Sequence, residues 1–389
     1  MQMSEQIMTK LRRDLLQADL LWQKRRRKIN TTCIFNDLCS AAATKRGLRH
    51  VVHKQDSDYT PEALGQARVK LPQHVFAQIN RSLQDVKYRI SGEKQSPRIF
   101  AIDGSKVHVH PCFMKHGYTT RTNNVPVSRP AIRPLAMLSS MLDVHSRTCY
   151  DAQITSHFNE RTSALAHMDA ARPQDTLIFD RGYYSRDLLQ AATSRGLKVV
   201  FRLKKTAFKG AATFWNSSKT RAVVPVSNQD GSCTLVLLVK YFIEGKKYMN
   251  LVNFQASTSE IKELYALRWR VETSFKRLKS YLNLEDSHSM CPSLYVQEIE
   301  ARILLDTLTM QLHTLRVYAL RAQKTDFGEK ESHTKQLRAI TMSYFKVLDD
   351  FLNILFVLKS ASLSRLNYKQ FKRLWSSFDP GPCLKRPGG

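Results

Sequence analysis

The sequence predicts an α/β protein in which a sheet-forming segment lies between two helical regions. Short apolar runs typical of buried strands, with helical segments between them, fill the middle of the 389-residue chain. The flanking segments show helical periodicity instead, and the length suits one large core with one or two smaller domains. We therefore expect four parts: helical residues 1–97, an α/β domain over 98–292, helical residues 293–380 and a disordered tail over 381–389.

The charge of the chain is strongly unbalanced. Lys and Arg number 61 against 33 for Asp and Glu, which gives a formal net charge of +28. Such an excess needs a polyanionic partner, either nucleic acid or an anionic membrane. No stretch approaches the ~18 apolar residues of a membrane span and no signal peptide is visible, so nucleic acid is the favoured partner.

The number and spacing of the cysteines indicate a reducing, intracellular environment. The seven cysteines are scattered and none forms a CxxC pair, which favours a reduced intracellular protein without a zinc site. We expect it to be DNA-associated, in the cytoplasm or nucleoid of a prokaryote or in the nucleus of a eukaryote.

Residues 1–97 carry a basic run between helical segments. The run consists of Lys24, Arg25, Arg26, Arg27 and Lys28. It is interpreted either as part of a DNA-binding region that contacts phosphates or as a solvated basic leader. In a eukaryotic host it would also suit a nuclear localisation signal.

From Arg98 the chain alternates between strands and helices. The expected strands are 98–110, 133–146, 147–156, 177–179 and 197–204. One expected helix begins near Asn159, and a second spans 186–194 with Gly196 as its C-cap. Three strands, helix, strand, helix, strand is the element order of a ribonuclease-H-like fold, whose first three strands form an antiparallel meander and whose last two are parallel.

Residues 205–257 are expected to add a β-strand insertion. The expected strands are Val223–Val226, Thr234–Val239 and Tyr248–Val252, with hairpin turns at 228–231 and 244–245. After the α/β domain, residues 299–322 and 339–366 again read as helices.

Two aspartates follow predicted strands. Asp103 comes at the end of the first strand and Asp180 at the end of the fourth. These strands are neighbours in the predicted fold, so both carboxylates should emerge at one edge of the sheet. Either acid alone reads as an ordinary turn residue. Gly104 and Gly182 would let a phosphate backbone approach closely.

A predicted helix over 260–282, capped by Ser259, supplies a third acid. Its buried face is formed by Leu264, Leu267, Val271, Phe275, Leu278 and Leu282. Beside that face run Tyr265, Arg268, Glu272 and Lys279. A metal-binding acid flanked by phosphate-binding groups has this pattern, and so does a plain amphipathic helix with a solvated basic edge.

These residues together resemble the insertion-sequence-four-like (YREK signature) group of DDE transposases. The signature is Tyr265, Arg268, Glu272 and Lys279 at the group's spacing. Four blocks also look like those of the family, namely IDGSK around Asp103, SHFNERTSA at 156–164, FDRGYYS around Asp180 and LYALRWRVETSFKRLK at 264–279. The resemblance covers about residues 98–290.

The resemblance implies a transposase that excises and inserts DNA by cut and paste. It implies a homodimer bound to double-stranded transposon ends and target, and two Mg²⁺ ions, with Mn²⁺ as a substitute. Asp103, Asp180 and Glu272 would be the catalytic, metal-binding triad. Tyr265, Arg268 and Lys279 would hold DNA phosphates, and Arg181 would either assist them or pair with a neighbouring acid.

Other functions stay open at this point. One alternative is a domesticated DNA-binding protein without cutting activity, but the intact triad argues against it. Another is a structure-specific nuclease on the same fold, which would cut DNA without strand transfer. Relatives stack an insertion-domain tryptophan on a flipped base, but no motif places Trp215 in that role, and a core or surface tryptophan is favoured.

Overall fold

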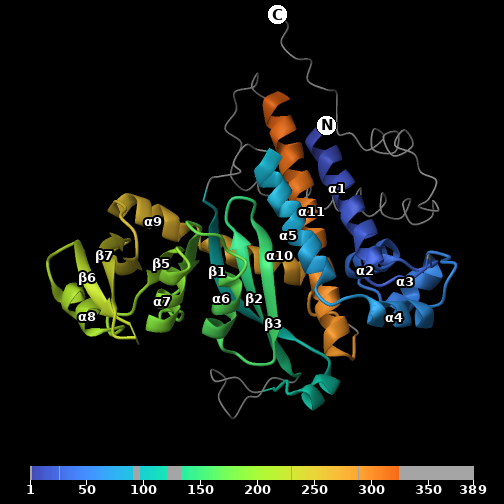
Figure 1. Cartoon of the computed structure of the whole chain (residues 1–389), viewed down its shortest axis with the longest axis horizontal. Helices are drawn as coiled ribbons and strands as arrows, with labels where there is room; N and C mark the ends of the chain where they lie inside the picture. Colours follow the sequence, from blue (N-terminus) through green and yellow to red (C-terminus); the bar gives the residue numbers. More distant parts are fainter. Residues whose placement is uncertain are drawn as a thin grey trace, which may run out of the picture. The chain divides into compact units, whose positions relative to one another are not determined.

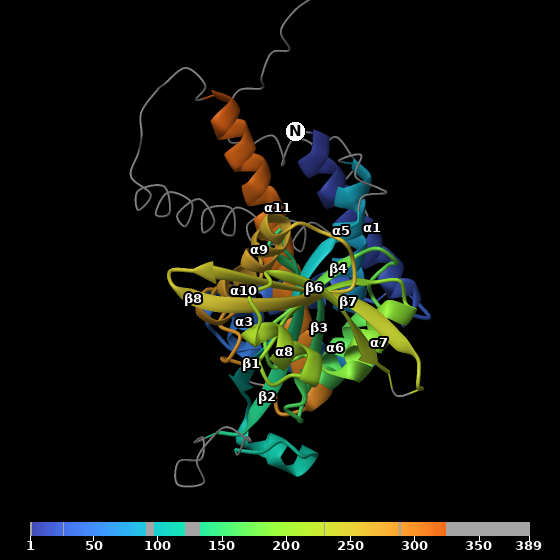
Figure 2. The ribbon, with the colours of Figure 1, turned by 90° about the vertical axis from the view of Figure 1, so that its left-hand side faces the viewer.

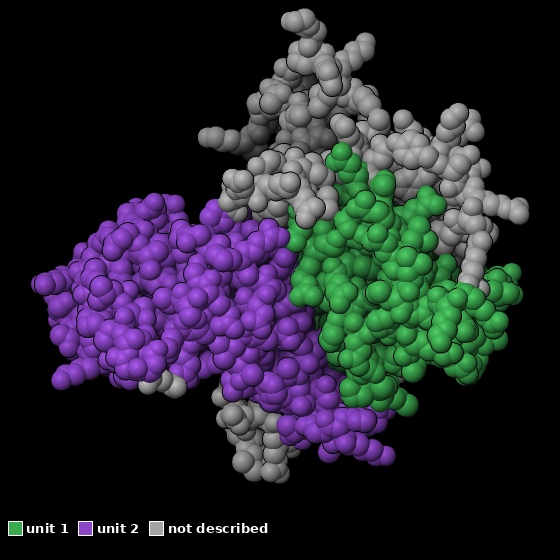
Figure 3. Space-filling view, viewed as in Figure 1, with its two compact units in different colours: residues 1–94, 281–389 green, residues 95–280 purple. Residues whose placement is uncertain are grey.

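The structure is a computed structural model of the 389-residue chain. It describes residues 2–25, 27–90, 97–120, 133–228, 230–287 and 289–323. The expected helix over 339–366 and the tail over 381–389 lie outside these residues. The chain divides into two compact units, residues 95–280 and residues 1–94 with 281–389 (Figure 3).

An eight-stranded sheet forms the framework of residues 95–280 (Figure 1). Its strands are β1 (Ile99–His108), β2 (Leu135–Asp143), β3 (Thr148–Thr155), β4 (Thr176–Phe179), β5 (Lys198–Arg202), β6 (Arg221–Ser227), β7 (Cys233–Ile243) and β8 (Lys246–Val252). They are ordered β3-β2-β1-β4-β5-β8-β7-β6. The first three are antiparallel, whereas β4 is parallel to β1 and β5 is parallel to β4, as expected from the sequence.

The three strands of the expected insertion extend this same sheet. Strand β8 pairs antiparallel with β5, and β7 and β6 follow it outward (Figure 2). The segment also contains a helix that the sequence pattern did not predict, α8 (Lys209–Asn216), which carries Trp215.

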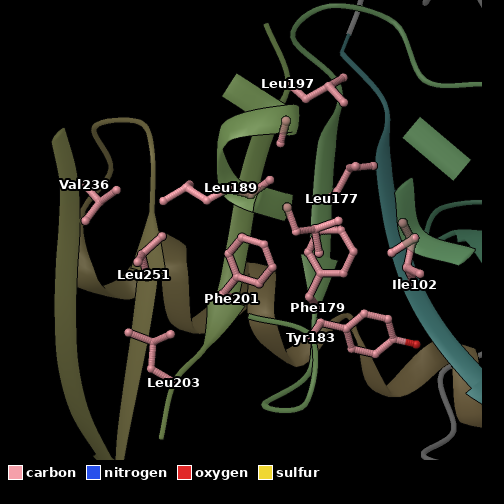
Figure 4. Close-up of a cluster of buried hydrophobic side chains, with 14 of the residues drawn as sticks. Ile102, Leu177, Phe179, Tyr183, Leu189, Leu197, Phe201, Leu203, Val236 and Leu251 are labelled. Atoms are coloured by element: carbon pink, nitrogen blue, oxygen red, sulfur yellow. The ribbon is translucent and has the colours of Figure 1, made fainter. Parts of the chain in front are cut away.

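Helices cover both faces of the sheet around β4 and β5. Because side chains alternate along a strand, Leu177 and Phe179 join one core cluster and Ile178 joins another. Figure 4 shows Leu177 and Phe179 of the first cluster with Leu189 of α7 (Arg186–Ser194), and α6 (Glu160–Met168) and α8 also contribute buried residues to this cluster. The second is closed by α9 (Thr258–Ala266) through buried Ile261. The C-cap of helix α7 is Arg195 and not Gly196 as predicted. Gly196 is the next residue and has a left-handed backbone conformation, with φ +66°.

The predicted helix over 260–282 is in fact two helices. Helix α9 ends at Ala266, and α10 (Trp269–Ser280) begins after a tight turn. The amides of Leu267 and Arg268 donate to carbonyls three residues back, at 3.1 Å each, so the backbone is tighter here than in an α-helix. No Gly or Pro marks this break.

The start of α9 also differs from the prediction. Ser257, not Ser259, is the N-cap, and its side chain and that of Glu260 form a capping box.

The other unit is helical. It contains α1 (Gln2–Leu20), α2 (Thr31–Thr44), α3 (Leu48–Lys54), α4 (Pro61–Lys70), α5 (Val75–Ile90) and α11 (Pro292–Gln323). Helix α11 packs against α5 and α2, and Arg68 Nη2 donates to Glu298 Oε1 at 2.9 Å in the interior. Helices that precede and follow residues 95–280 in the sequence therefore pack together. No helix in the described residues combines the length and the apolar character needed to cross a membrane.

Candidate active site

The strand register brings Asp103 and Asp180 to the same edge of the sheet. The last parallel pair between β1 and β4 is Ile102 with Phe179, and each aspartate comes directly after its member of that pair. Strand β1 itself continues to His108, because it stays paired with β2 beyond the end of β4, so Asp103 lies inside β1 and not at its end as predicted. Asp103 thus lies where the sheet loses a neighbouring strand, which leaves its side chain room for other partners.

Arg268 joins Asp103 to Glu272. Its Nη1 donates to Asp103 Oδ2 at 3.1 Å and its Nη2 donates to Glu272 Oε1 at 2.8 Å. Arg268 is buried, whereas the Glu272 side chain is 38% exposed. The turn between α9 and α10 places the guanidinium in this position, and its two-pronged geometry suits two carboxylates from different segments.

Tyr265 contacts the third acid. Its hydroxyl donates to Asp180 Oδ1 at 2.9 Å, and Arg202 Nη1 lies 4.0 Å from the same oxygen. Arg202 ends β5 and had no role predicted from the sequence. The three acids predicted as a triad are therefore held by two neighbouring residues of the predicted signature.

The two aspartates have pKa values shifted in opposite directions. Burial raises the pKa of Asp103, helped by the charges of Asp180 and Glu272, and outweighs the opposing Gly104 amide and Arg268. Burial acts in the same direction on Asp180, but the Arg181 amide, the Tyr265 hydroxyl and nearby Arg charges lower its pKa overall. Burial and the charge of Asp180 raise the pKa of Tyr265 to about 12, so this phenol is a neutral donor at neutral pH.

Two further residues predicted to bind phosphate are Lys279 on α10 and Arg181 after β4. Lys279 Nζ donates to the backbone carbonyl of Lys106 on β1 at 2.5 Å. Arg181 is exposed directly after Asp180.

The described residues of the basic run are exposed to solvent, whereas Trp215 packs against the core. Lys24, Arg25, Arg27 and Lys28 are exposed between α1 and α2, and Arg26 lies outside the described residues. Trp215 packs against the core, and Lys247 Nζ lies 4.7 Å from the centre of its ring.

Sequence reasoning missed Glu160. A Cβ built on Gly104 would lie 3.1 Å from Glu160 Oε1, and one built on Gly182 would lie 3.7 Å from Glu160 Oε2. The open sides of both glycines thus face this carboxylate, and their predicted role in the approach of a phosphate backbone stays a prediction. In the sequence, Asn159 signals an N-cap and Glu160 looks like an ordinary acid in the first turn of a helix. Only the fold brings Glu160 close to the segments that carry the two aspartates.

The site is rich in hard oxygen donors, which suits a divalent cation. As the side chains stand, no three Asp, Glu, His or Cys residues in the described part of the chain are grouped closely enough to hold a metal ion. Arg268 instead supplies the positive charge between Asp103 and Glu272. The donor set fits such an ion provided that these side chains close around it.

Comparison with known proteins supports a family assignment. Residues 94–305, more than half of the chain, match the family model described as transposase DDE domain. Among solved structures, the cryo-EM structure of the piggyBac transposase synaptic complex with hairpin DNA matches with 13% sequence identity and a TM-score of 0.43, covering 98% of this chain and 84% of that chain. A search of curated proteins finds no match.

Proposed function

The chain belongs to the transposase DDE domain family, and on that premise we propose that it cleaves DNA at transposon ends and joins those ends to target DNA. One observation carries the proposal. Arg268 contacts Asp103 and Glu272, and Tyr265 contacts Asp180. Two side chains suited to binding phosphate thus contact three acids that lie far apart in the sequence.

Asp103, Asp180 and Glu272 would hold two Mg²⁺ ions, or Mn²⁺ in their place. When bound, such a pair activates the attacking oxygen, from water or from a 3′ hydroxyl, and stabilises the leaving oxygen. Burial raises the pKa of Asp103, whereas hydrogen bonds and nearby Arg charges lower that of Asp180, and a bound cation would favour the ionised form of both.

The signature side chains would bind the scissile phosphate and its neighbours. Arg268 bridges carboxylates in the absence of DNA, and a guanidinium accepts a phosphate in the same bidentate manner. Tyr265, as a neutral phenol, would donate to a non-bridging oxygen. Lys279 and exposed Arg181 would supply further positive charge along the backbone of the DNA.

The partners of the chain would be double-stranded transposon ends and target DNA, bound by a homodimer. The formal charge of +28 supports binding to a polyanion of this size. The exposed basic residues between α1 and α2 would add contacts to the DNA backbone.

The test uses DNA from the locus itself. Duplexes that carry the inverted repeats flanking the gene should be cut at the repeat boundary with Mg²⁺ and left intact with EDTA. With target plasmid present, the labelled end should then appear in joined products. Cutting without joining would leave a structure-specific nuclease, and binding without cutting would leave a non-catalytic DNA-binding protein.

A further inference from the structure

A fourth acid faces the aspartate pair. Glu160 is the first residue of α6, and Asn159, the N-cap, accepts a hydrogen bond from the Thr162 amide. The two glycines that face the Glu160 carboxylate follow Asp103 by one residue and Asp180 by two. Its carboxylate therefore lies next to the two segments that carry the aspartates.

Glu160 has no side-chain partner within the described residues. No hydrogen bond or ion pair to another described side chain or backbone group engages its carboxylate, although it is half-buried. The charges that act on it are those of Asp103 and Asp180, with Lys106 opposing them. A half-buried acid placed among like charges raises the free energy of the fold unless a cation binds there.

Tyr183 provides an independent sign that something binds at this point. It is 1% exposed, and its hydroxyl oxygen has no hydrogen-bond partner among the described residues. The ring packs on Phe179, while the oxygen points away from the neighbouring labelled core side chains (Figure 4). The charges that act on this hydroxyl are those of Glu160, Asp103, Asp180 and Arg268. A buried, unpaired hydroxyl is costly, and a bound water or phosphate oxygen would satisfy it.

A buried hydrogen-bond chain fixes the helix that carries Glu160. His167, near the end of α6, contacts Asp151 Oδ2 through Nδ1 at 2.7 Å and Ser139 Oγ through Nε2 at 3.0 Å. These partners lie on β3 and β2, so α6 is attached to the sheet. The position of Glu160 at the other end of α6 is therefore built into the fold.

We propose that Glu160 is a fourth carboxylate of the cation site formed with Asp103 and Asp180, and that the Tyr183 hydroxyl donates to a water or phosphate oxygen held there. This inference rests on the proposed function, because it assigns one more ligand to the same metal centre. Gly104 then makes room for Glu160, because a Cβ at this position would lie only 3.1 Å from Glu160 Oε1.

Metal affinity measured without DNA tests the inference separately from catalysis. Free Mn²⁺ is followed by electron paramagnetic resonance while the full-length chain is titrated. Glu160→Gln keeps the size of the side chain and removes its charge, so we expect binding to weaken by about tenfold or more. Asp103→Asn should weaken it similarly, and Glu263→Gln, on an exposed part of α9, should bind like the wild type.

The outcomes separate the two proposals. Wild-type binding by Asp103→Asn would overturn the metal centre itself. If Asp103→Asn binds weakly while Glu160→Gln matches Glu263→Gln, the centre stands and Glu160 is not part of it.

Thermal melts in EDTA distinguish a ligand from a structural residue. Glu160→Gln should melt at or above the wild-type temperature, since it removes one of several like charges. A clear fall in melting temperature in EDTA would show instead that Glu160 supports the fold and would overturn the inference. Tyr183→Phe keeps the ring, so it should fold normally and bind Mn²⁺ less tightly; unchanged binding would remove the hydroxyl from the site.

Discussion

Arg268 is the residue on which the described state of the site depends. It occupies the space between Asp103 and Glu272, whose charges would otherwise repel each other. A lysine could not serve both acids in this way, because its single ammonium lacks the planar fork of donors. The same guanidinium is proposed to bind phosphate, so the DNA-free and DNA-bound states would use Arg268 differently.

Glu272→Gln separates chemistry from binding. It keeps the shape of the side chain but removes the charge that a cation needs, so we expect it to abolish Mg²⁺-dependent cleavage of an end duplex. Binding of the same duplex should be unchanged or tighter, because a negative charge near phosphate is removed. A cleavage time course and a gel shift on one oligonucleotide measure both. Cleavage near the wild-type rate would show that Glu272 is not catalytic.

Arg268→Ala should weaken both end binding and cleavage, in contrast to Glu272→Gln. It removes a phosphate ligand and leaves Asp103 and Glu272 without the charge that now joins them. Lys279→Ala should act in the same direction on binding. The gel shift and time course described for Glu272→Gln apply, and a loss of cleavage with full end binding would exclude a phosphate role for Arg268.

At the scale of elements, strand order was predictable and the helix break was not. The apolar runs before Asp103 and Asp180 identify adjacent strands, because short buried strands have a clear composition and a strand–helix–strand order restricts how they pair. The turn at Leu267 and Arg268 contains no Gly or Pro, so only the tertiary contacts of Arg268 reveal it. Glu160 escaped prediction for a similar reason: its neighbours come from β1 and from the loop after β4.

The break changes which leucine on this stretch matters for stability. Leu278 on α10 is fully buried, whereas Leu267, in the turn, is only half-buried. Leu278→Ala should therefore lower the free energy of unfolding by about 2–5 kcal/mol, and Leu267→Ala by clearly less. Denaturant melts of the two variants make the comparison. Equal losses would mean that the two leucines are equally packed, as one continuous helix would require.

At the scale of the whole molecule, charge and fold are divided between two units. Residues 95–280 contain the acids of the candidate site, and residues 1–94 contain an exposed basic run. Composition alone predicted a polyanionic partner from the charge of +28, but it could not assign the basic run to the interface. That assignment needs a measurement of binding.

The salt dependence of DNA binding supplies it. The logarithm of the affinity should fall linearly with the logarithm of the salt concentration, with a slope of about 0.9 for each phosphate neutralised. If the run Lys24–Lys28 contacts the backbone, replacing its five basic residues by Gln should weaken binding to all sequences alike and make this slope shallower. The matched control replaces five exposed lysines of the other unit, namely Lys204, Lys205, Lys209, Lys219 and Lys246. Because both variants lose the same charge, a shallower slope in the first alone would place Lys24–Lys28 in the interface. An unchanged slope would show that DNA does not contact this run, and an equal change in both would show only the effect of net charge.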